Sequence, residues 1–211
     1  MLLIGQYDSP FVRRVGIALT TYGMAFQHKP WSTFGDADKI AKLNPLRRVP
    51  TLVTDDHVAY VDSALILGVI DEMAGARASL ARPGAQGREL LRLCGFAAGA
   101  AEKGVSLVYE GAFREAALPM WVERCTAQVA ETLDLLEAVR AERSTPYLFD
   151  GAPSHADVML SVMWTFLTGA QPKAFDWGRW PALAAHAARC EALPAFHAIN
   201  QPFKLVTPGE A

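Results

Sequence analysis

The order of strand and helix patterns along the chain is the feature that most limits its possible folds. Strand-like and helical runs alternate through residues 1–80, whereas no strand pattern follows residue 88. Leu2–Tyr7 predicts a buried strand, Pro10–Tyr22 predicts a helix from its apolar spacing, and Phe26–Trp31 predicts a second strand. A strand, a helix and a strand in succession predict a parallel strand pair.

The rest of the first 80 residues predicts a mixed sheet. Gly35–Leu43 predicts a short helix, and Thr51–Thr54 with His57–Tyr60 predicts an antiparallel hairpin. Asp62–Met73 predicts a helix, because its apolar residues fall on one face. The expected order is β-α-β-α-β-β-α, a thioredoxin-like arrangement within an α/β domain.

The composition changes after this region. Residues 74–88 carry three glycines and a proline in a polar stretch, which is typical of a linker. We therefore expect an α/β domain at 1–78, a linker at 79–88 and an all-α helical bundle at 89–211. Within the bundle, the patterns predict helices at 88–110, 113–143, 154–169, 179–192 and 195–200.

Composition excludes several classes of function. The formal net charge is −2, which leaves no overall electrostatic footprint for nucleic acid or anionic membrane. The apolar stretch Val158–Ala170 is shorter than the about 20 residues that span a bilayer. Cys94, Cys125 and Cys190 form no metal-ligand pattern, so we expect no metal. No secretion signal is visible, and we expect a reducing cytoplasm.

Ser9 is the first of three residues or pairs that could carry chemistry. It stands at the junction of the first strand and the first helix, before Pro10 at a favoured first helical position. The local pattern favours a Ser9 side chain that caps the helix. The alternative is a hydroxyl that faces a ligand thiol, where the helix N-terminus favours a thiolate.

The other two candidates flank the expected hairpin. Val49-Pro50 precedes it and fits an ordinary edge-strand proline, and the base rate favours a trans bond. The alternative is a cis bond that leaves the backbone of Val49 free to pair with an extended peptide. Asp62-Ser63 follows the hairpin and fits a helix N-cap. These two side chains could instead hold an ammonium group and a carboxylate.

The order and spacing of these motifs resemble the glutathione transferase superfamily. Ser9-Pro10-Phe11, the run Asn44–Pro50 and Asp62-Ser63 carry the resemblance, which spans essentially the whole chain and is closest to bacterial members that begin Ser-Pro-Phe-Val-Arg. The resemblance implies that Ser9 contacts the glutathione sulfur. It also implies that Val49 pairs with the cysteinyl unit beside a cis Pro50.

The same resemblance assigns the remaining glutathione contacts. It implies that Asp62 and Ser63 hold the γ-glutamyl end and that Arg48 meets the glycyl carboxylate, although Arg48 fits a solvated surface residue equally well. Leu46-Arg47 departs from the family's usual glycine in this loop. Because Ser9 stands where omega-like relatives carry a cysteine, a mixed disulfide with glutathione is disfavoured.

The resemblance also covers the helical domain. Ser154 and Asp157 match the family's structural capping box. Tyr109, Phe113 and Trp164 are candidates for a second-substrate pocket, although aromatic residues are more often plain core. Tyr7 could replace Ser9 in the chemistry, but its place on the strand directs it elsewhere.

These observations predict a detoxifying transferase that conjugates the thiolate of glutathione, its co-substrate, to small and mostly apolar electrophiles. The resemblance implies a homodimer. Two alternatives stay open: a glutathione-dependent peroxidase or dehalogenase of the same fold, and a non-catalytic binding module.

Overall fold

The computed structural model describes residues 1–205 and contains two compact units. Residues 1–81 and the described part of 194–211 form the first unit, and residues 82–193 form the second. These limits differ from the expected ones, because residues 194–205 join the first unit instead of the helical one. Residues 206–211 of the expected helical domain lie outside the described residues.

The first unit contains a four-stranded mixed sheet in the order β2-β1-β3-β4. Its strands are β1 (Leu2–Ile4), β2 (Gln27–Lys29), β3 (Thr51–Val53) and β4 (Ala59–Val61). The expected parallel pair β1–β2 and the expected hairpin β3–β4 are confirmed, and β1 also pairs antiparallel with β3. Strand β1 is shorter than expected because Gly5 leaves the extended conformation at φ +125°.

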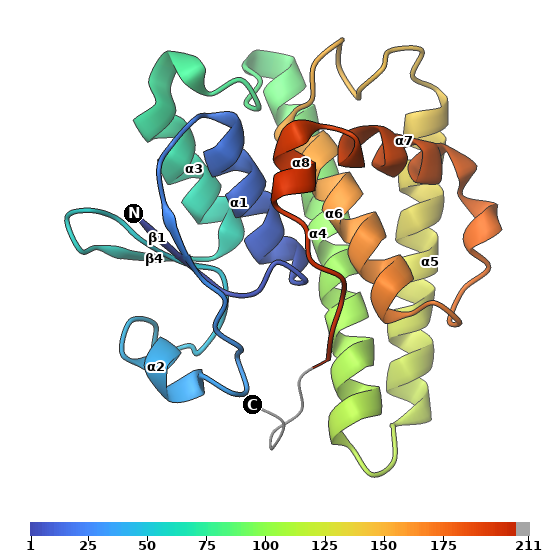
Figure 1. Ribbon diagram of the computed structural model, residues 1–211. Helices are drawn as coiled ribbons and strands as arrows, with labels where there is room; N and C mark the ends of the chain where they lie inside the picture. The colour runs from blue at the N-terminus through green and yellow to red at the C-terminus, as the bar shows by residue number, and fades with distance from the viewer. Residues whose placement is uncertain (206–211) are drawn as a thin grey trace. The chain divides into compact units, whose positions relative to one another are not determined.

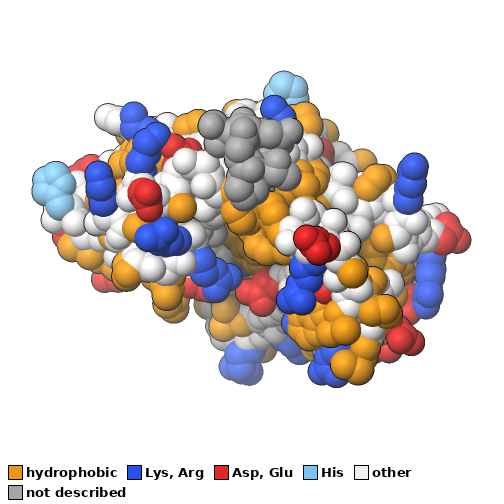
Figure 2. Space-filling view, turned by 90° about the horizontal axis from the view of Figure 1, so that it is seen from below, with side chains coloured by type: hydrophobic (Ala, Val, Ile, Leu, Met, Phe, Trp, Pro, Cys, Tyr) orange, Lys and Arg blue, Asp and Glu red, His pale blue; other side chains and the backbone are white. Residues whose placement is uncertain are grey.

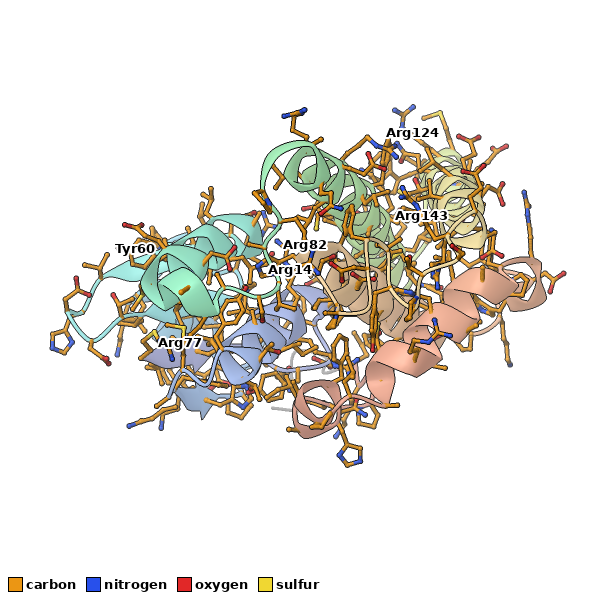
Figure 3. The ribbon with its side chains drawn as sticks, turned by 90° about the horizontal axis from the view of Figure 1, so that it is seen from above. Arg14, Tyr60, Arg77, Arg82, Arg124 and Arg143 are labelled. Atoms are coloured by element: carbon orange, nitrogen blue, oxygen red, sulfur yellow. The ribbon has the colours of Figure 1, made fainter. Side chains whose placement is uncertain are left out.

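Helices α1 (Pro10–Thr21) and α3 (Ser63–Ala74) pack against each other in this unit. They supply much of the first unit's core, as Val15, Ile17, Leu19, Ile66 and Ile70 are fully buried. The 3₁₀ turn Gly75–Arg77 follows α3, and Arg77, labelled in Figure 3, donates to the carbonyl of Tyr22 at 3.0 Å. The unit also contains α2 (Ala37–Ala41) and α8 (Pro194–Ala198).

The second unit is helical in all its regular structure. Its elements are α4 (Gly84–Phe113), α5 (Pro119–Ala141), α6 (His155–Ala170), the 3₁₀ turn Trp177–Arg179 and α7 (Pro181–Glu191). Helix α4 packs on both α5 and α6 (Figure 1). Gly104 permits a close approach, because a Cβ there would lie 2.3 Å from Cδ2 of Leu167.

The starts of two helices of the second unit differ most from the sequence expectation. Helix α4 begins at Gly84, inside the expected linker. The second expected helix starts at Pro119 instead of residue 113, because proline is favoured at the first helical position. The connection is tied by the buried Glu110, whose carboxylate accepts the Leu118 N–H at 2.8 Å and pairs with Arg114.

The expected capping box is present at the start of α6. The Ser154 hydroxyl accepts the Asp157 N–H at 3.5 Å, and the Asp157 carboxylate accepts the Ser154 N–H at 2.8 Å. Both residues are fully buried. Asp157 also accepts the N–H of Leu148 at 2.8 Å, so one carboxylate fixes the helix start and the preceding loop.

Charged side chains of both signs are interspersed on the face shown in Figure 2. This distribution agrees with the formal net charge of −2. Within residues 1–205, no helix is both long and apolar enough to cross a membrane.

Candidate functional site

The sheet register brings the three sequence motifs to one end of the first unit. Ile4 of β1 pairs with Thr51 of β3, and Thr51 pairs with Val61 of β4. The chain therefore passes through Gly5, Pro50 and Asp62 at the same end of three neighbouring strands. Helices α1 and α3 both follow these strand ends, and they begin at Pro10, next to Ser9, and at Ser63.

Ser9 takes the N-cap position of α1 but does not cap the helix with its side chain. Its backbone is extended at φ −72° and ψ 121°, Pro10 follows as the first helical residue, and the hydroxyl makes no capping hydrogen bond. The expectation of a side-chain cap was therefore wrong. The first-turn N–H groups lack intrahelical acceptors, and with the helix dipole they favour an anion beside Ser9.

Gly5 sets how closely the Val49 segment approaches α1. A Cβ at Gly5 would lie 2.5 Å from Cγ2 of Val12 and 2.8 Å from Cβ of Val49. Val12 is in the first turn of α1, three residues after Ser9. Gly5 thus lies between the Ser9 turn and the residue that the resemblance pairs with a peptide ligand.

The Val49–Pro50 peptide bond is cis. The trans bond that the base rate favoured is therefore not the one present. The cis bond agrees with what the family resemblance implies for Pro50. Among the described residues, the backbone of Val49 has no hydrogen-bond partner, since β3 begins at Thr51. An extended ligand could pair with this backbone as an added strand does.

Asn44 organises the loop that leads to Val49. It is 1% exposed, its amide donates to the Arg48 carbonyl at 2.9 Å and to the Thr51 hydroxyl at 3.1 Å, and its carbonyl oxygen accepts the Leu46 N–H at 3.0 Å. Arg47 adopts a left-handed φ of +52° in this loop, where the family usually has glycine. The loop therefore contains a left-handed residue that is not a glycine.

Asp62 and Ser63 divide their roles at the start of α3. Asp62 is the N-cap, and its side chain accepts the Ala64 N–H at 2.8 Å. Its φ of +68° with ψ of 124° is rare for a residue with a side chain, and such strain gathers at functional sites. Ser63 is buried at the first helical position. Its hydroxyl makes no hydrogen bond to another described residue.

Arg48 lies on the surface of the same loop as Val49. The neighbouring Arg47 pairs with Asp38 at 3.4 Å. Of the two guanidinium groups before the cis proline, Arg47 thus already pairs with a carboxylate, and Arg48 is the second exposed cation of a type that suits a ligand carboxylate.

Tyr7 is used in packing. Its ring stacks on His28 with centroids 3.8 Å apart, and its Cε1 lies 3.0 Å from the position of a Cβ on Gly16. Burial raises the pKa of Tyr7 to about 12, which opposes a role as an ionised base at neutral pH. Because the Tyr7 ring is stacked on His28, whereas Ser9 stands at the N-terminus of α1 without a capping bond, Ser9 is the better candidate for contact with a thiol.

The aromatic candidates of the helical unit fall into two groups. Tyr109 and Phe113, near the end of α4, are partly exposed and form an edge-to-face pair with centroids 5.5 Å apart. The ring of Trp164 on α6 packs edge-to-face on the ring of Trp177, with centroids 5.4 Å apart. Trp177 in turn contacts the ring of Trp180.

Sequence reasoning gave no role to two residues on which the site depends, Gly5 and Asn44. The side-chain oxygen of Asn44 accepts the N–H two residues further on, which is an Asx turn. The Asn44-Pro45 dipeptide is typical of such a turn, so this residue could have been found from the sequence. No comparable signal marks Gly5, because its neighbours are brought to it by long-range packing.

Comparisons with known proteins match both the N-terminal and the helical part of the chain to one family. Residues 3–78 match the family model of the glutathione S-transferase N-terminal domain, and residues 119–189 match that of the C-terminal domain. An uncharacterized GST-like protein of Escherichia coli K12, YibF, is 33% identical over 165 residues, 77% of this chain and 77% of that protein.

Solved structures share the fold. A glutathione S-transferase of Methylobacterium radiotolerans in complex with glutathione sulfonate has a TM-score of 0.89 at 23% identity, covering 98% of this chain and 97% of that one. A glutathione transferase family member of Pseudomonas fluorescens with bound glutathione has a TM-score of 0.81 at 25% identity, covering 96% and 99%. With both domains matched in chain order and a relative above 30% identity, this chain belongs to the glutathione S-transferase family.

Proposed function

We propose that the protein is a glutathione transferase in which Ser9 stabilises the thiolate of bound glutathione for attack on small, mostly apolar electrophiles. The observation that carries the proposal is the Ser9 hydroxyl, which stands at the N-terminus of α1 without a capping bond. Glutathione bound to structures with this fold, and glutathione sulfonate bound to another, support the choice of thiol.

The chemistry follows from the charge of a thiolate. A hydroxyl that donates to sulfur stabilises the thiolate more than the thiol and so lowers the thiol's pKa. The α1 N-terminus acts in the same direction. The glutathione sulfur is thereby ionised near neutral pH and held beside the electrophile. Ionisation of the nucleophile and its proximity to the electrophile together accelerate the reaction.

Three further contacts would hold the rest of glutathione. The backbone of Val49, before the cis Pro50, pairs with the cysteinyl unit. Asp62 and Ser63 take the ammonium and carboxylate of the γ-glutamyl end, and Arg48 takes the glycyl carboxylate. These assignments are supported by the sheet register, because Val49 and Arg48 precede β3 and Asp62 and Ser63 follow β4 at the same end of the sheet. Tyr109, Phe113 and Trp164 are proposed to line the electrophile pocket.

We also propose a homodimer that pairs the N-terminal domain of one chain with the helical domain of the other. Large apolar side chains are exposed on α3 and α4, including Leu65 at 68% and Leu91 at 70%. Sedimentation equilibrium should give twice the chain mass of 22.9 kDa. A species of single chain mass at micromolar concentration would contradict the dimer.

The free thiols at Cys94, Cys125 and Cys190 suit a reducing cytoplasm and detoxification there.

The function is tested with the purified wild-type chain. Ultraviolet absorbance of the thiolate, followed against pH, should show that bound glutathione ionises below its free pKa. A panel of aryl halides, activated alkenes, haloalkanes and hydroperoxides should then show conjugation as the fastest reaction. Faster hydroperoxide reduction or dehalogenation would identify a different glutathione chemistry. Absence of binding would identify a non-catalytic member of the family.

A further inference from the structure

The C-terminal segment (residues 194–205) is part of the unit that contains the sheet. Its helix α8 packs on α1 (Figure 1). Ile199 takes the space left by a glycine of α1, since a Cβ on Gly16 would lie 2.9 Å from Ile199 Cγ2. The segment is therefore seated on the helix that follows Ser9.

Arg13 fastens the segment to the first turn of α1. The residue is 3% exposed, its Nε donates to the Ile199 carbonyl at 2.7 Å, and its Nη2 donates to the Phe196 carbonyl at 3.2 Å. A buried guanidinium requires such acceptors. The N–H of Arg13 donates to the Ser9 carbonyl at 2.9 Å, so one residue contacts both the segment and Ser9.

Two further hydrogen bonds join the segment to the residues just before Ser9. The Oε1 of Gln201 accepts the Tyr7 N–H at 3.1 Å, and the Lys204 N–H donates to the Asp8 carboxylate at 3.3 Å. The N–H of Ser9 itself donates to the Gln6 carbonyl at 3.2 Å. Tyr7 and Asp8, in the turn that leads to Ser9, are thus held by hydrogen bonds from the C-terminal segment.

These bonds matter because the Ser9 hydroxyl has no capping bond to fix it. The direction of the hydroxyl depends on the backbone of the turn that carries it. A side chain that fixes the Tyr7 amide therefore also limits where the hydroxyl can point. Small displacements of a catalytic group cost much rate.

We propose that Gln201 is a positioning residue for Ser9: its side-chain carbonyl holds the Tyr7 amide and so orients the Ser9 hydroxyl toward the glutathione sulfur. This inference rests on the proposed function, since it assigns Gln201 a part in ionising the thiol. It makes the C-terminal segment (residues 194–205) a component of the glutathione site.

The test replaces Gln201 with methionine, which keeps the length and packing of the side chain but removes the strong acceptor. In Gln201→Met, the Tyr7 amide should exchange with solvent faster. The kcat should fall about fivefold, while the KM for glutathione stays within about twofold. The pKa of the bound thiol should rise. Gln201→Glu keeps an acceptor oxygen and should recover slow amide exchange and most of kcat.

Asn200→Ala is the matched control, because Asn200 is the exposed neighbour of Gln201. It should leave kcat, the thiol pKa and the Tyr7 exchange rate as in wild type. If wild type ionises glutathione but Gln201→Met keeps the wild-type kcat and thiol pKa, the positioning role is wrong. If wild type itself leaves the thiol pKa unchanged, the proposed function fails, and this role fails with it.

Discussion

The Nε–H of Arg140 donates to Nδ1 of His186 at 3.1 Å, which fixes the proton of the neutral imidazole on Nε2. That nitrogen lies 3.4 Å from the Asp157 carboxylate, at the capping box of α6. His186 is 1% exposed. Because Nδ1 already accepts the Arg140 N–H, protonation of Nδ1 to form the imidazolium would break this hydrogen bond. Burial above all, and then the cationic Arg140 and Arg189 against the opposing Asp157, lower the pKa of His186 to about 4.

This arrangement predicts a loss of stability in mild acid. Between the unfolded pKa of about 6.5 and the folded pKa of about 4, the unfolded chain binds more protons at His186 than the folded chain does. The free energy of unfolding should therefore fall as pH drops through this window, by roughly 3 kcal/mol at most. Chemical denaturation at several pH values measures it. His186→Gln should flatten the profile, whereas the exposed His197→Gln should not.

Asp157→Ala should damage folding and leave glutathione binding unchanged. The carboxylate accepts the N–H groups of Ser154 and Leu148 and the Ser154 hydroxyl in a fully buried site. Each unsatisfied buried group costs about 1–3 kcal/mol, so we expect a loss of at least about 2 kcal/mol. Thermal melting measures this loss, with the exposed Glu131→Ala as a control that stays within about 0.5 kcal/mol. An unchanged melting temperature with a large rise in the KM for glutathione would show that Asp157 binds ligand instead.

Ser63→Ala should weaken glutathione binding by roughly 1–3 kcal/mol, the cost of a lost hydrogen bond to a charged group. The fold should lose less than about 1 kcal/mol, because the carboxylate of Asp62 caps α3 and remains in place. Calorimetry with glutathione and with cysteinylglycine, which lacks the γ-glutamyl end, measures the discrimination. Equal losses for both ligands would mean that Ser63 does not contact that end.

Gly5→Ala should disrupt both the fold and glutathione binding. The new Cβ would lie 2.5 Å from Val12 Cγ2 and 2.8 Å from Val49 Cβ, at a φ of +125° that alanine rarely adopts. Strain and overlap together should cost more than about 3 kcal/mol. Gly111→Ala on α4 is the control, because nothing lies within 4 Å of its Cβ position, and it should be neutral or stabilising. A Gly5→Ala variant with wild-type stability and affinity would contradict the described junction.

The sequence predicted the order of elements well because each has a local signal. Apolar periodicity marks α1 and α3, and the Ser154–Asp157 spacing marks the start of α6. The details of the site depend on contacts that no local pattern records. Gly5 meets Val49 only after β1 pairs with β3, and Arg13 meets Ile199 from 186 residues away. The same holds for Ser9, whose local pattern favours a cap that the folded turn does not form.

The central claim is that the Ser9 hydroxyl stabilises the glutathione thiolate, and titration of the bound thiol in Ser9→Ala tests it most directly. Ultraviolet absorbance should show a higher thiol pKa and a lower kcat in Ser9→Ala, with much of the affinity for glutathione retained. Tyr7→Phe is the matched control and should keep the wild-type thiol pKa, because the Tyr7 ring is used in packing against His28. A thiol pKa that is the same in wild type and Ser9→Ala would remove Ser9 from the chemistry.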